Sequence, residues 1–559
     1  MVKVSLNPRL LLVLAASVFA LSALLGTAAY SKPDPKGKPS PGKAAPGKAA
    51  PGKAAPGKAA PGKAAPGGRT VEVQVLGLNE THGQLNPLSQ RNADGSRTNV
   101  GGAAALATYL ENEEAENPRT LTVDSGDFMQ GPAISSYFEG KPTVEVYNEI
   151  GVDSVAVGNH EFDWGRDALA QRISEAEFPF LANNIVEDAT GDQPEGIAPY
   201  KVFNLKGVKV GVVGVGNPDT KNVTLPEATE GLSFLNVEET AAEVAGTVEE
   251  LQKNKVQTII VTPHMGLESE TEGPLAEMLS LLPANAADEI DFVLGGHIPL
   301  DITAEINGIP VMQPLGNTRG YADVTLTVDR KTKDVVGYGA SSDRVITDSV
   351  APDAAVREIV DRYQAELNEA LGGTVGEATT SILRGQTRGV ESEMGNFVTD
   401  SMRAYFPDVD FAFTNAGGLR ADIDEGPVTL EEVYAVLPFN NTLVTMNLTG
   451  AQVEQVLEEG ANSRYGTVQV SGLTWAYDAD APFGDRVTRV TVNGQPIDPN
   501  ATYKIATNNF MATGGDEFDT FTEGSNTFDT QLNLVDTVVR YLDRNSPVDP
   551  QVEGRLTVE

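Results

Sequence analysis

The four histidines of the chain all lie in its first 300 residues, and each comes shortly after an apolar segment. They are His82, His160, His264 and His297. In open α/β sheets, ligands bind beyond the carboxyl ends of the strands, so side chains in these places can share one site. A single histidine is often structural, but four of them with carboxylates nearby favour a metal centre.

Other side chains that could bind a metal or move a proton lie close to these histidines in the sequence. They are Glu80, Asp124, Asp127, Asn159 and Asp163. Mixed imidazole and carboxylate ligands suit Zn, Mn, Fe or Co better than a site that takes only Mg. A shared carboxylate can bridge two such ions about 3.5–4 Å apart and support in-line displacement at phosphorus.

Short apolar runs alternate with helical stretches up to about residue 345, which predicts an α/β domain over residues 69–345. The predicted strands are Val71–Leu76, Thr120–Val123, Ser154–Val157, Val208–Val215, Thr258–Val261, Asp291–Leu294, Pro310–Gln313 and Val324–Val328. Apolar residues at helical spacing predict an amphipathic helix over 353–371, within a linker at 346–373. A second α/β region is expected over 374–559.

Five blocks in the first domain, in this order, resemble the calcineurin-like metallophosphatases. They are Asn-Glu-Thr-His-Gly at 79–83, Gly126-Asp127, Gly158-Asn159-His160-Glu161, Pro263-His264 and Gly295-Gly296-His297. The second half resembles the C-terminal domain of the bacterial 5'-nucleotidase/UDP-sugar hydrolase family and of animal ecto-5'-nucleotidase. The resemblance implies an α/β fold: a metallophosphatase sandwich of mixed β-sheets flanked by helices, joined by a helix to a second α/β nucleotide-binding domain.

The resemblance also implies two divalent metal ions, Zn, Mn or similar, and a nucleophile that is metal-bound water. The implied metal ligands are Glu80, His82, Asp127, Asn159, His264 and His297. Asp127 would bridge both ions, and Glu80 and His82 would belong to the site that lacks Asn159. The implied catalytic pair is His160, facing the phosphate, and Asp163, which would orient it.

Two positions depart from the family and predict that one metal site is weak. Glu80 stands where the family usually has Asp, and Pro299 stands where it usually has His or Gln. Proline has no side-chain ligand. The alternative is that Asp124 or Asp301 replaces the missing ligand.

The second region would hold the substrate, again by resemblance. The implied substrate-binding residues are Arg388, Asn415, Gly418, Arg420, Phe439, Phe510 and Asp516. The two arginines would bind phosphate, because a guanidinium donates two parallel hydrogen bonds. The two phenylalanines would clamp a base, Asn415 would touch the base and Asp516 would accept hydrogen bonds from ribose. Taken singly, either phenylalanine would more often be a core residue, and only the combination with the metal domain favours the clamp.

The N-terminal residues predict export. A basic start and an apolar run from Leu10 to Leu25 predict a signal peptide over residues 1–29, with an uncleaved membrane anchor as the alternative. Residues 30–68 include five copies of Pro-Gly-Lys-Ala-Ala and predict an extended basic tether. The tether is either a spacer or a contact with an anionic cell-surface polymer. We therefore expect a secreted, periplasmic or cell-surface protein with no transmembrane segment in its mature chain.

The remainder of the chain is strongly acidic. Residues 69–559 carry 31 basic and 77 acidic residues, a net charge of −46. Such a surface argues against general nucleic-acid binding, and it also repels small anions at long range. The small nucleotide expected as partner is implied by the resemblance. The chain has no cysteine, which excludes disulfides, thiolate metal sites and a cysteine nucleophile.

The resemblance, together with the N-terminal export pattern, implies an extracytoplasmic, metal-dependent phosphoric ester hydrolase that acts on nucleoside 5'-phosphates. Nucleoside di- and triphosphates and UDP-sugars are further expected substrates, and nucleotide catabolism is the expected role. Two alternatives remain open. One is a 2',3'-cyclic phosphodiesterase/3'-nucleotidase of the same family, and the other is a catalytically weak, cell-surface nucleotide-binding protein.

Overall fold

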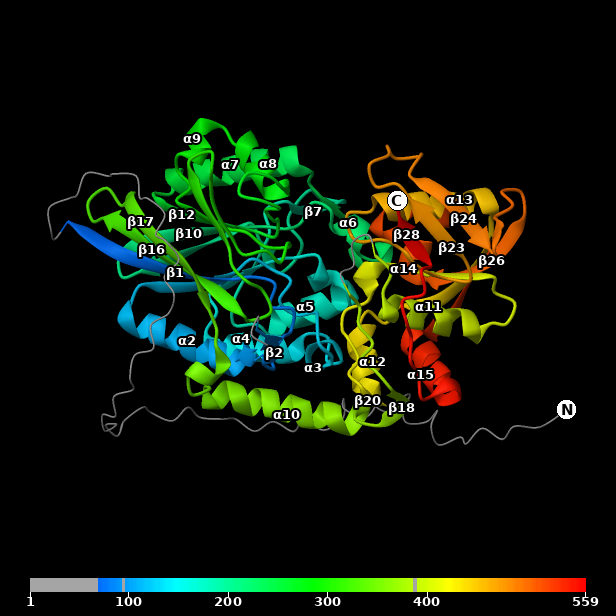
Figure 1. The fold of residues 1–559 in the computed structure, drawn as a ribbon. Coiled ribbons are helices and arrows are strands. Elements are labelled where there is room, and N and C mark those ends of the chain that lie inside the picture. The colour runs from blue at the N-terminus through cyan, green and yellow to red at the C-terminus, as the bar shows by residue number, and fades with distance from the viewer. Residues whose placement is uncertain (1–68, 93–95, 386–389) are drawn as a thin grey trace. The chain divides into compact units, whose positions relative to one another are not determined.

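The computed structural model describes residues 69–92, 96–385 and 390–559 (Figure 1). The predicted signal peptide, the predicted tether and Arg388 lie outside these residues. Within the described residues, no helix combines the length and apolar character that crossing a membrane requires.

A mixed seven-stranded sheet contains the first strand of the described chain. Its strand order is β17 (Val335–Arg344), β16 (Gly320–Asp329), β1 (Thr70–Leu78), β4 (Thr120–Asp124), β5 (Ser154–Ala156), β6 (Phe180–Leu181) and β8 (Ile197–Ala198). The strands from β1 to β8 run parallel, whereas β16 pairs antiparallel with both β1 and β17.

A second sheet has six strands. Its order is β14 (Ile302–Ile306), β15 (Ile309–Gln313), β13 (Phe292–Leu294), β12 (Thr258–Pro263), β10 (Val208–Val215) and β9 (Tyr200–Leu205). One buried cluster contains Val73 and Val75 of β1 together with Val210 and Val212 of β10, so the two sheets pack face to face. This is the predicted sandwich of mixed sheets.

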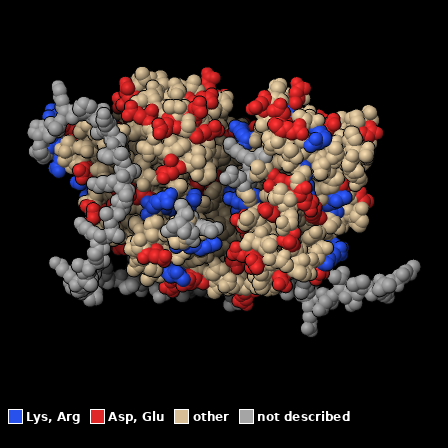
Figure 2. Space-filling model, in the orientation of Figure 1, with Lys and Arg blue, Asp and Glu red and all other residues tan. Residues whose placement is uncertain are grey.

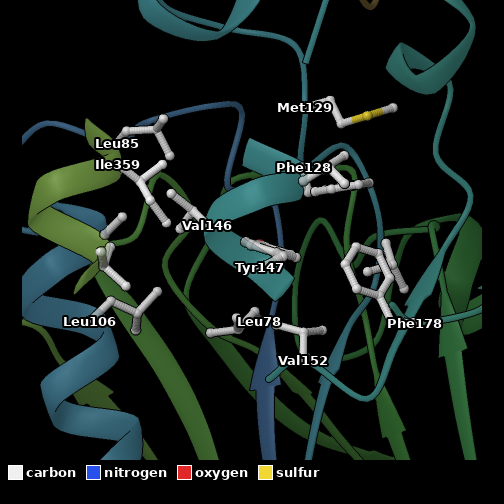
Figure 3. Packing of buried hydrophobic residues seen from close by; sticks show 14 of the residues in the cluster. Leu78, Leu85, Leu106, Phe128, Met129, Val146, Tyr147, Val152, Phe178 and Ile359 are labelled. Carbon is white, nitrogen blue, oxygen red and sulfur yellow. The ribbon is translucent and has the colours of Figure 1, made fainter. Parts of the chain in front are cut away.

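Helices cover the outer faces of both sheets, because alternate strand residues point outward and are also apolar. On the seven-stranded sheet, Leu78 belongs to one buried cluster with Leu106 of α2 (Ala103–Glu116), Tyr147 of α4 (Lys141–Ile150) and Ile359 (Figure 3). On the six-stranded sheet, Val213 and Val215 pack with helices α7 (Val237–Lys253) and α8 (Pro274–Leu281).

The predicted helix over 353–371 is confirmed as α10 (Ala354–Leu371). The Asp353 side chain caps its start by accepting a hydrogen bond from the Val356 N–H at 2.8 Å. The apolar residues that gave the prediction are its buried ones: Val356, Ile359, Val360, Tyr363, Leu367 and Leu371. Helix α10 contacts α2 and α4, and its other neighbours include α12 (Leu430–Val436).

The region after α10 is also α/β. Its main sheet has the order β22 (Gln469–Ser471), β19 (Phe411–Thr414), β26 (Thr502–Asn508), β21 (Thr442–Thr449) and β27 (Ser525–Asn533). A four-stranded sheet has the order β25 (Gln495–Pro496), β24 (Val487–Val492), β23 (Thr474–Tyr477) and β28 (Leu556–Val558). The longer helices are α11 (Glu393–Tyr405), α13 (Gly450–Asn462) and α15 (Leu534–Asn545).

Candidate metal centre

The structure brings the four histidines together at the ends of β1, β5, β12 and β13. The rings of His82 and His160 have centroids 5.2 Å apart, and those of His264 and His297 are 5.1 Å apart. These strands belong to both sheets, so the site lies where the carboxyl ends of the two sheets meet.

Two groups of donor atoms share the Asp127 carboxylate. One group is His82, Asp127 and His160, and the other is Asp127, His264 and His297. Within each group the donor atoms lie within 4.8 Å of one another. Two sets of imidazoles on a common carboxylate fit a pair of divalent ions. His160, expected to be catalytic, also lies within reach of the first ion position.

Four of the expected ligands have a strained backbone. The φ angles are 48° for Glu80, 47° for His82, 53° for Asp127 and 68° for His297. A non-glycine residue in the left-handed region costs free energy, and such residues gather at functional sites. The surrounding structure thus holds these side chains in place at a cost in stability.

Glu80 connects the two donor groups. Its Oε2 lies 3.1 Å from His82 Nε2, while its Oε1 accepts a hydrogen bond from the His297 N–H at 2.6 Å. Burial alone would raise the pKa of this carboxyl, but the hydrogen bond from His82 and the charge of His264 outweigh burial and lower the pKa. The Glu80 carboxylate therefore contacts one histidine of each donor group, His82 and His297.

The histidines beside Asp127 have opposite pKa shifts. Burial would lower the pKa of His264, but the adjacent Asp127, with Oδ2 at 2.9 Å from Nε2, raises it to about 10. Burial and the nearby His264 lower the pKa of His297 to about 4. A neutral His297 keeps an unprotonated ring nitrogen, which metal ligation requires.

His160 is held on two sides. Its Nδ1 lies 2.8 Å from Asp163 Oδ2, and its backbone N–H donates to Asp127 Oδ1 at 2.8 Å. His160 and Asp163 belong to or flank a short 3₁₀ turn, η1 (His160–Phe162). The Asp163 carboxylate therefore fixes the ring orientation and leaves Nε2 available for chemistry.

The two residues considered as replacement ligands do not join either donor group. Asp124 accepts hydrogen bonds from the Gly126 N–H and the Tyr147 hydroxyl, both at 2.7 Å. Asp301 is exposed. Neither Asp124 nor Asp301 therefore supplies the metal ligand that is absent at Pro299.

Glu161 is a buried residue that the sequence reasoning left without a role. Its carboxylate accepts hydrogen bonds from the backbone N–H groups of Asp127 at 2.9 Å, Gly158 at 2.7 Å and Phe128 at 3.1 Å. It therefore fixes the backbone that presents Asp127. The sequence feature that could have indicated this role is the position of Glu161 directly after His160, in the block Gly158-Asn159-His160-Glu161.

Residues of the second region reach this centre. The ring of Phe439 is stacked on His160, with centroids 5.8 Å apart, and the Arg420 guanidinium lies 5.6 Å from the Phe439 centroid. Burial and the neighbouring Arg384 lower the pKa of Arg420, whereas the charge of Asp163 opposes this shift.

Arg384, four residues before Arg388, is a second residue to which the sequence pattern assigned no role. Its Nη1 donates to the Leu419 carbonyl at 3.3 Å, which holds it beside the Arg420 segment. The sequence signal was a second arginine in the same segment. Arg388 itself lies outside the described residues.

Among the remaining expected substrate residues, Asn415 and Asp516 form a buried polar pair. Asn415 Nδ2 donates to Asp516 Oδ2 at 2.7 Å, and burial raises the pKa of Asp516 to about 6. Gly418 lies against the Asn415 side chain. Any residue with a Cβ at position 418 would place that atom 2.8 Å from Asn415 Oδ1, which is too close. Phe510 packs over Gly515, where a Cβ would lie 2.4 Å from the ring. Among the described aromatic pairs, Phe439 contacts His160 and not Phe510.

Comparison with known proteins matches both regions. Residues 73–301 match the calcineurin-like phosphoesterase family, and residues 374–523 match the 5'-nucleotidase C-terminal domain. Endonuclease YhcR of Bacillus subtilis is 30% identical over 461 residues, which cover 79% of this chain and 37% of that protein. Cell wall protein Lmo0130 of Listeria monocytogenes is 28% identical over 514 residues, covering 81% of this chain and 64% of that protein.

The chain thus spans less than two thirds of the length of these two relatives. A solved structure matches more completely. The 5'-nucleotidase precursor from Thermus thermophilus is 29% identical, with a TM-score of 0.78, covering 87% of this chain and 99% of that chain. The chain therefore belongs to the 5'-nucleotidase family, with a calcineurin-like phosphoesterase domain followed by a 5'-nucleotidase C-terminal domain.

Proposed function

We propose that this protein is an extracytoplasmic, metal-dependent phosphoesterase that hydrolyses nucleoside 5'-phosphates, including di- and triphosphates and UDP-sugars. The observation that carries the proposal is the stacking of Phe439 on His160, with Arg420 over the same phenylalanine ring. A cation and an aromatic ring from the C-terminal domain lie at the metal centre, so a phosphate held there would be close to groups that bind nucleotides.

Two divalent ions, Zn, Mn or similar, would be held with Asp127 in common. Asn159, His264 and His297 would surround one ion, and Glu80 and His82 the other. When bound, such ions polarise phosphoryl oxygens and lower the pKa of water. The left-handed backbone at Glu80, His82, Asp127 and His297 supports a role for these residues beyond packing.

The protein side chains would supply the remaining chemistry. Asp163 holds Nδ1 of His160, so Nε2 would carry the proton that stabilises the phosphate or passes to the leaving oxygen. Arg420 and Arg388 would bind phosphate oxygens.

The nucleoside would bind farther into the C-terminal domain. Phe439 and Phe510 would lie on either side of the base, Asn415 would contact the base and Asp516 would accept from ribose hydroxyls. Gly418 would leave room for Asn415 beside the ligand.

We further propose the boundaries and location that the sequence indicates. These are a signal peptide at 1–29, a tether at 30–68, a metal domain at 69–345, a linker at 346–373 and a substrate domain at 374–559. The relative Lmo0130 bears the name of a cell wall protein, which supports a secreted, periplasmic or cell-surface location.

The test is phosphate release from a nucleotide panel by chelated protein to which defined metals are added back. We expect release from nucleoside 5'-phosphates only with metal. Asp163→Asn should lower turnover, whereas Asp167→Asn, an exposed neighbour in α5 (Gly165–Glu175), should not. Nucleotide binding without release under every metal would favour the binding-protein alternative.

The panel should also contain 2',3'-cyclic nucleotides, 3'-nucleotides and single-stranded DNA and RNA. Preferred release from cyclic or 3'-esters would favour the phosphodiesterase alternative. The polymers are included because the relative YhcR is named an endonuclease. We expect little cleavage of polymers, since acidic residues outnumber basic ones in the chain and red acidic patches are more extensive than blue basic ones on the face in Figure 2.

A further inference from the structure

The turn after β10 approaches the metal centre and contains a residue that has no role so far. Strand β10 ends at Val215, and Gly216 and Asn217 lead into a short helix, α6 (Thr220–Val223). Asn217 is 5% exposed, although this turn connects a strand to a surface helix. A buried amide needs hydrogen-bond partners, so its contacts identify its role.

The backbone before Asn217 is held rigidly. The buried Asn184 side chain accepts from the Gly216 N–H at 2.7 Å and donates to the Gly216 carbonyl at 2.9 Å. Both polar groups of Gly216 are thus fixed by one side chain. The position of the Asn217 Cα therefore varies little.

The orientation of the Asn217 amide follows from its own turn. Its Oδ1 accepts a hydrogen bond from the Asp219 N–H at 2.9 Å. Because a backbone N–H only donates, the oxygen must face Asp219 and the Nδ2 must face the opposite side.

On that opposite side are two of the expected metal ligands. Asn217 Nδ2 lies 3.3 Å from Asn159 Oδ1 and within 3.3–3.4 Å of the ring nitrogens of His297. An amide NH₂ only donates. Asn159 Oδ1 has two lone pairs and can accept from Asn217 while it binds a metal, whereas a neutral imidazole has one acceptor nitrogen, which a bound metal would occupy. Asn217 thus lies between the ends of two different sheets, since Asn159 follows β5 and His297 follows β13.

We propose that Asn217 is a positioning residue that orients the Asn159 side chain toward one of the two metal ions. The inference rests on the metal binding in the proposed function and not on which phosphate ester is hydrolysed. Partners beyond the direct ligands commonly contribute about 10–100-fold to metal affinity. We expect that magnitude here, for the ion held by Asn159, His264 and His297.

The experiment measures metal binding directly on the full chain. Metal-free Asn217→Ala protein is titrated with Mn or Zn against a competing chelator. We expect the dissociation constant of one ion to rise about 10–100-fold and that of the other to change much less. Asn222→Ala, at an exposed position in α6, is the matched control and should bind as the unmodified protein does.

Thermal unfolding with and without metal separates positioning from simple stability. A positioning role predicts that metal raises the melting temperature of Asn217→Ala less than that of the unmodified protein, in addition to the loss of stability that both forms of the variant share because the Asp219 N–H loses its acceptor. Unchanged metal affinity would overturn the proposal. So would a loss of stability that is equal with and without metal. Both readouts stay decisive if the protein binds metal but releases no phosphate from nucleotides.

Discussion

The rings of His160 and Phe439 are stacked, with planes inclined by 21° and centroids 5.8 Å apart. His160 belongs to the metal domain and Phe439 to the C-terminal domain, so this contact joins the expected proton-transfer group to the expected base clamp. Arg420 lies on the same phenylalanine ring, 5.6 Å from its centroid. Phe439 therefore packs against the groups expected to act on phosphate, whereas Phe510 packs over Gly515.

The two phenylalanines should differ in their effect on substrates with and without a base. Phe510→Ala should lower kcat/KM for AMP by roughly 5–100-fold, the value of a lost stacking contact, and leave ribose 5-phosphate hydrolysis nearly unchanged. Phe439→Ala should lower both, because His160 and Arg420 lose their support. Phe528→Ala, at a position 61% exposed, is the control. Equal losses on both substrates from Phe510→Ala would contradict the clamp.

The two metal ions should be held unequally. Glu80 already bonds to His82 and to the His297 N–H, and Pro299 supplies no ligand. We expect one ion to survive dialysis and the other to be lost and then restored by added Mn or Zn. Pro299→His should raise retention of the second ion, whereas Leu300→His at the exposed neighbour should not. Metal analysis that finds two ions per chain after dialysis of the unmodified protein would refute the weak site.

An ion pair joins the two domains close to the metal centre. Arg464 Nη2 lies 2.5 Å from Asp219 Oδ2, and both side chains are partly exposed, at 47% and 36%. We expect domain motion to be needed for product release, since such motions often limit turnover. Cysteines at positions 219 and 464, joined by a reducible thiol cross-linker, should lower kcat until the linker is cleaved.

The absence of native cysteine confines this cross-link to the two introduced thiols. Each single-cysteine variant, treated with the same reagent, controls for loss of the ion pair. Full turnover in a verified cross-linked sample would mean that the domains need not move apart.

Two aspartates at the starts of strands should make stability depend on pH. Asp153 precedes β5 and accepts from the Thr122 N–H, and Asp291 precedes β13 and accepts from the Ile259 N–H, both at 2.9 Å. Burial raises the pKa of Asp153 to about 6 and that of Asp291 to about 7.

The folded protein therefore binds a proton on each of these two aspartates more tightly than the unfolded chain does. The stability they contribute is complete below pH about 4 and is lost as the pH rises through about 7. Asp291→Asn retains an acceptor for the Ile259 N–H without a buried charge.

The melting temperature of Asp291→Asn, relative to the unmodified protein, should thus rise by a few degrees between pH 5 and pH 8. The exposed Asp288→Asn should show no such trend. A difference that stays constant with pH would contradict the assigned cause.

Local patterns in the sequence were enough to predict the main elements. The predicted strand Val208–Val215 has the observed bounds, and the helix over 353–371 differs from α10 by one residue at its start. Both follow from backbone hydrogen bonding and side-chain periodicity, which act over a few residues. The same patterns placed each histidine after a strand.

The tertiary structure decided which side chains meet at those strand ends. Strand β10 carries valines on both of its faces, so its sequence cannot tell which valines pack between the sheets and which face α7. Asn217 reaches Asn159 and His297 only because two sheets place the ends of distant strands together. Likewise, the contact of Phe439 with His160 depends on packing between domains. Such contacts arise from the register and packing of segments far apart in the chain, whereas the sequence by itself determined the elements and the kinds of ligand they carry.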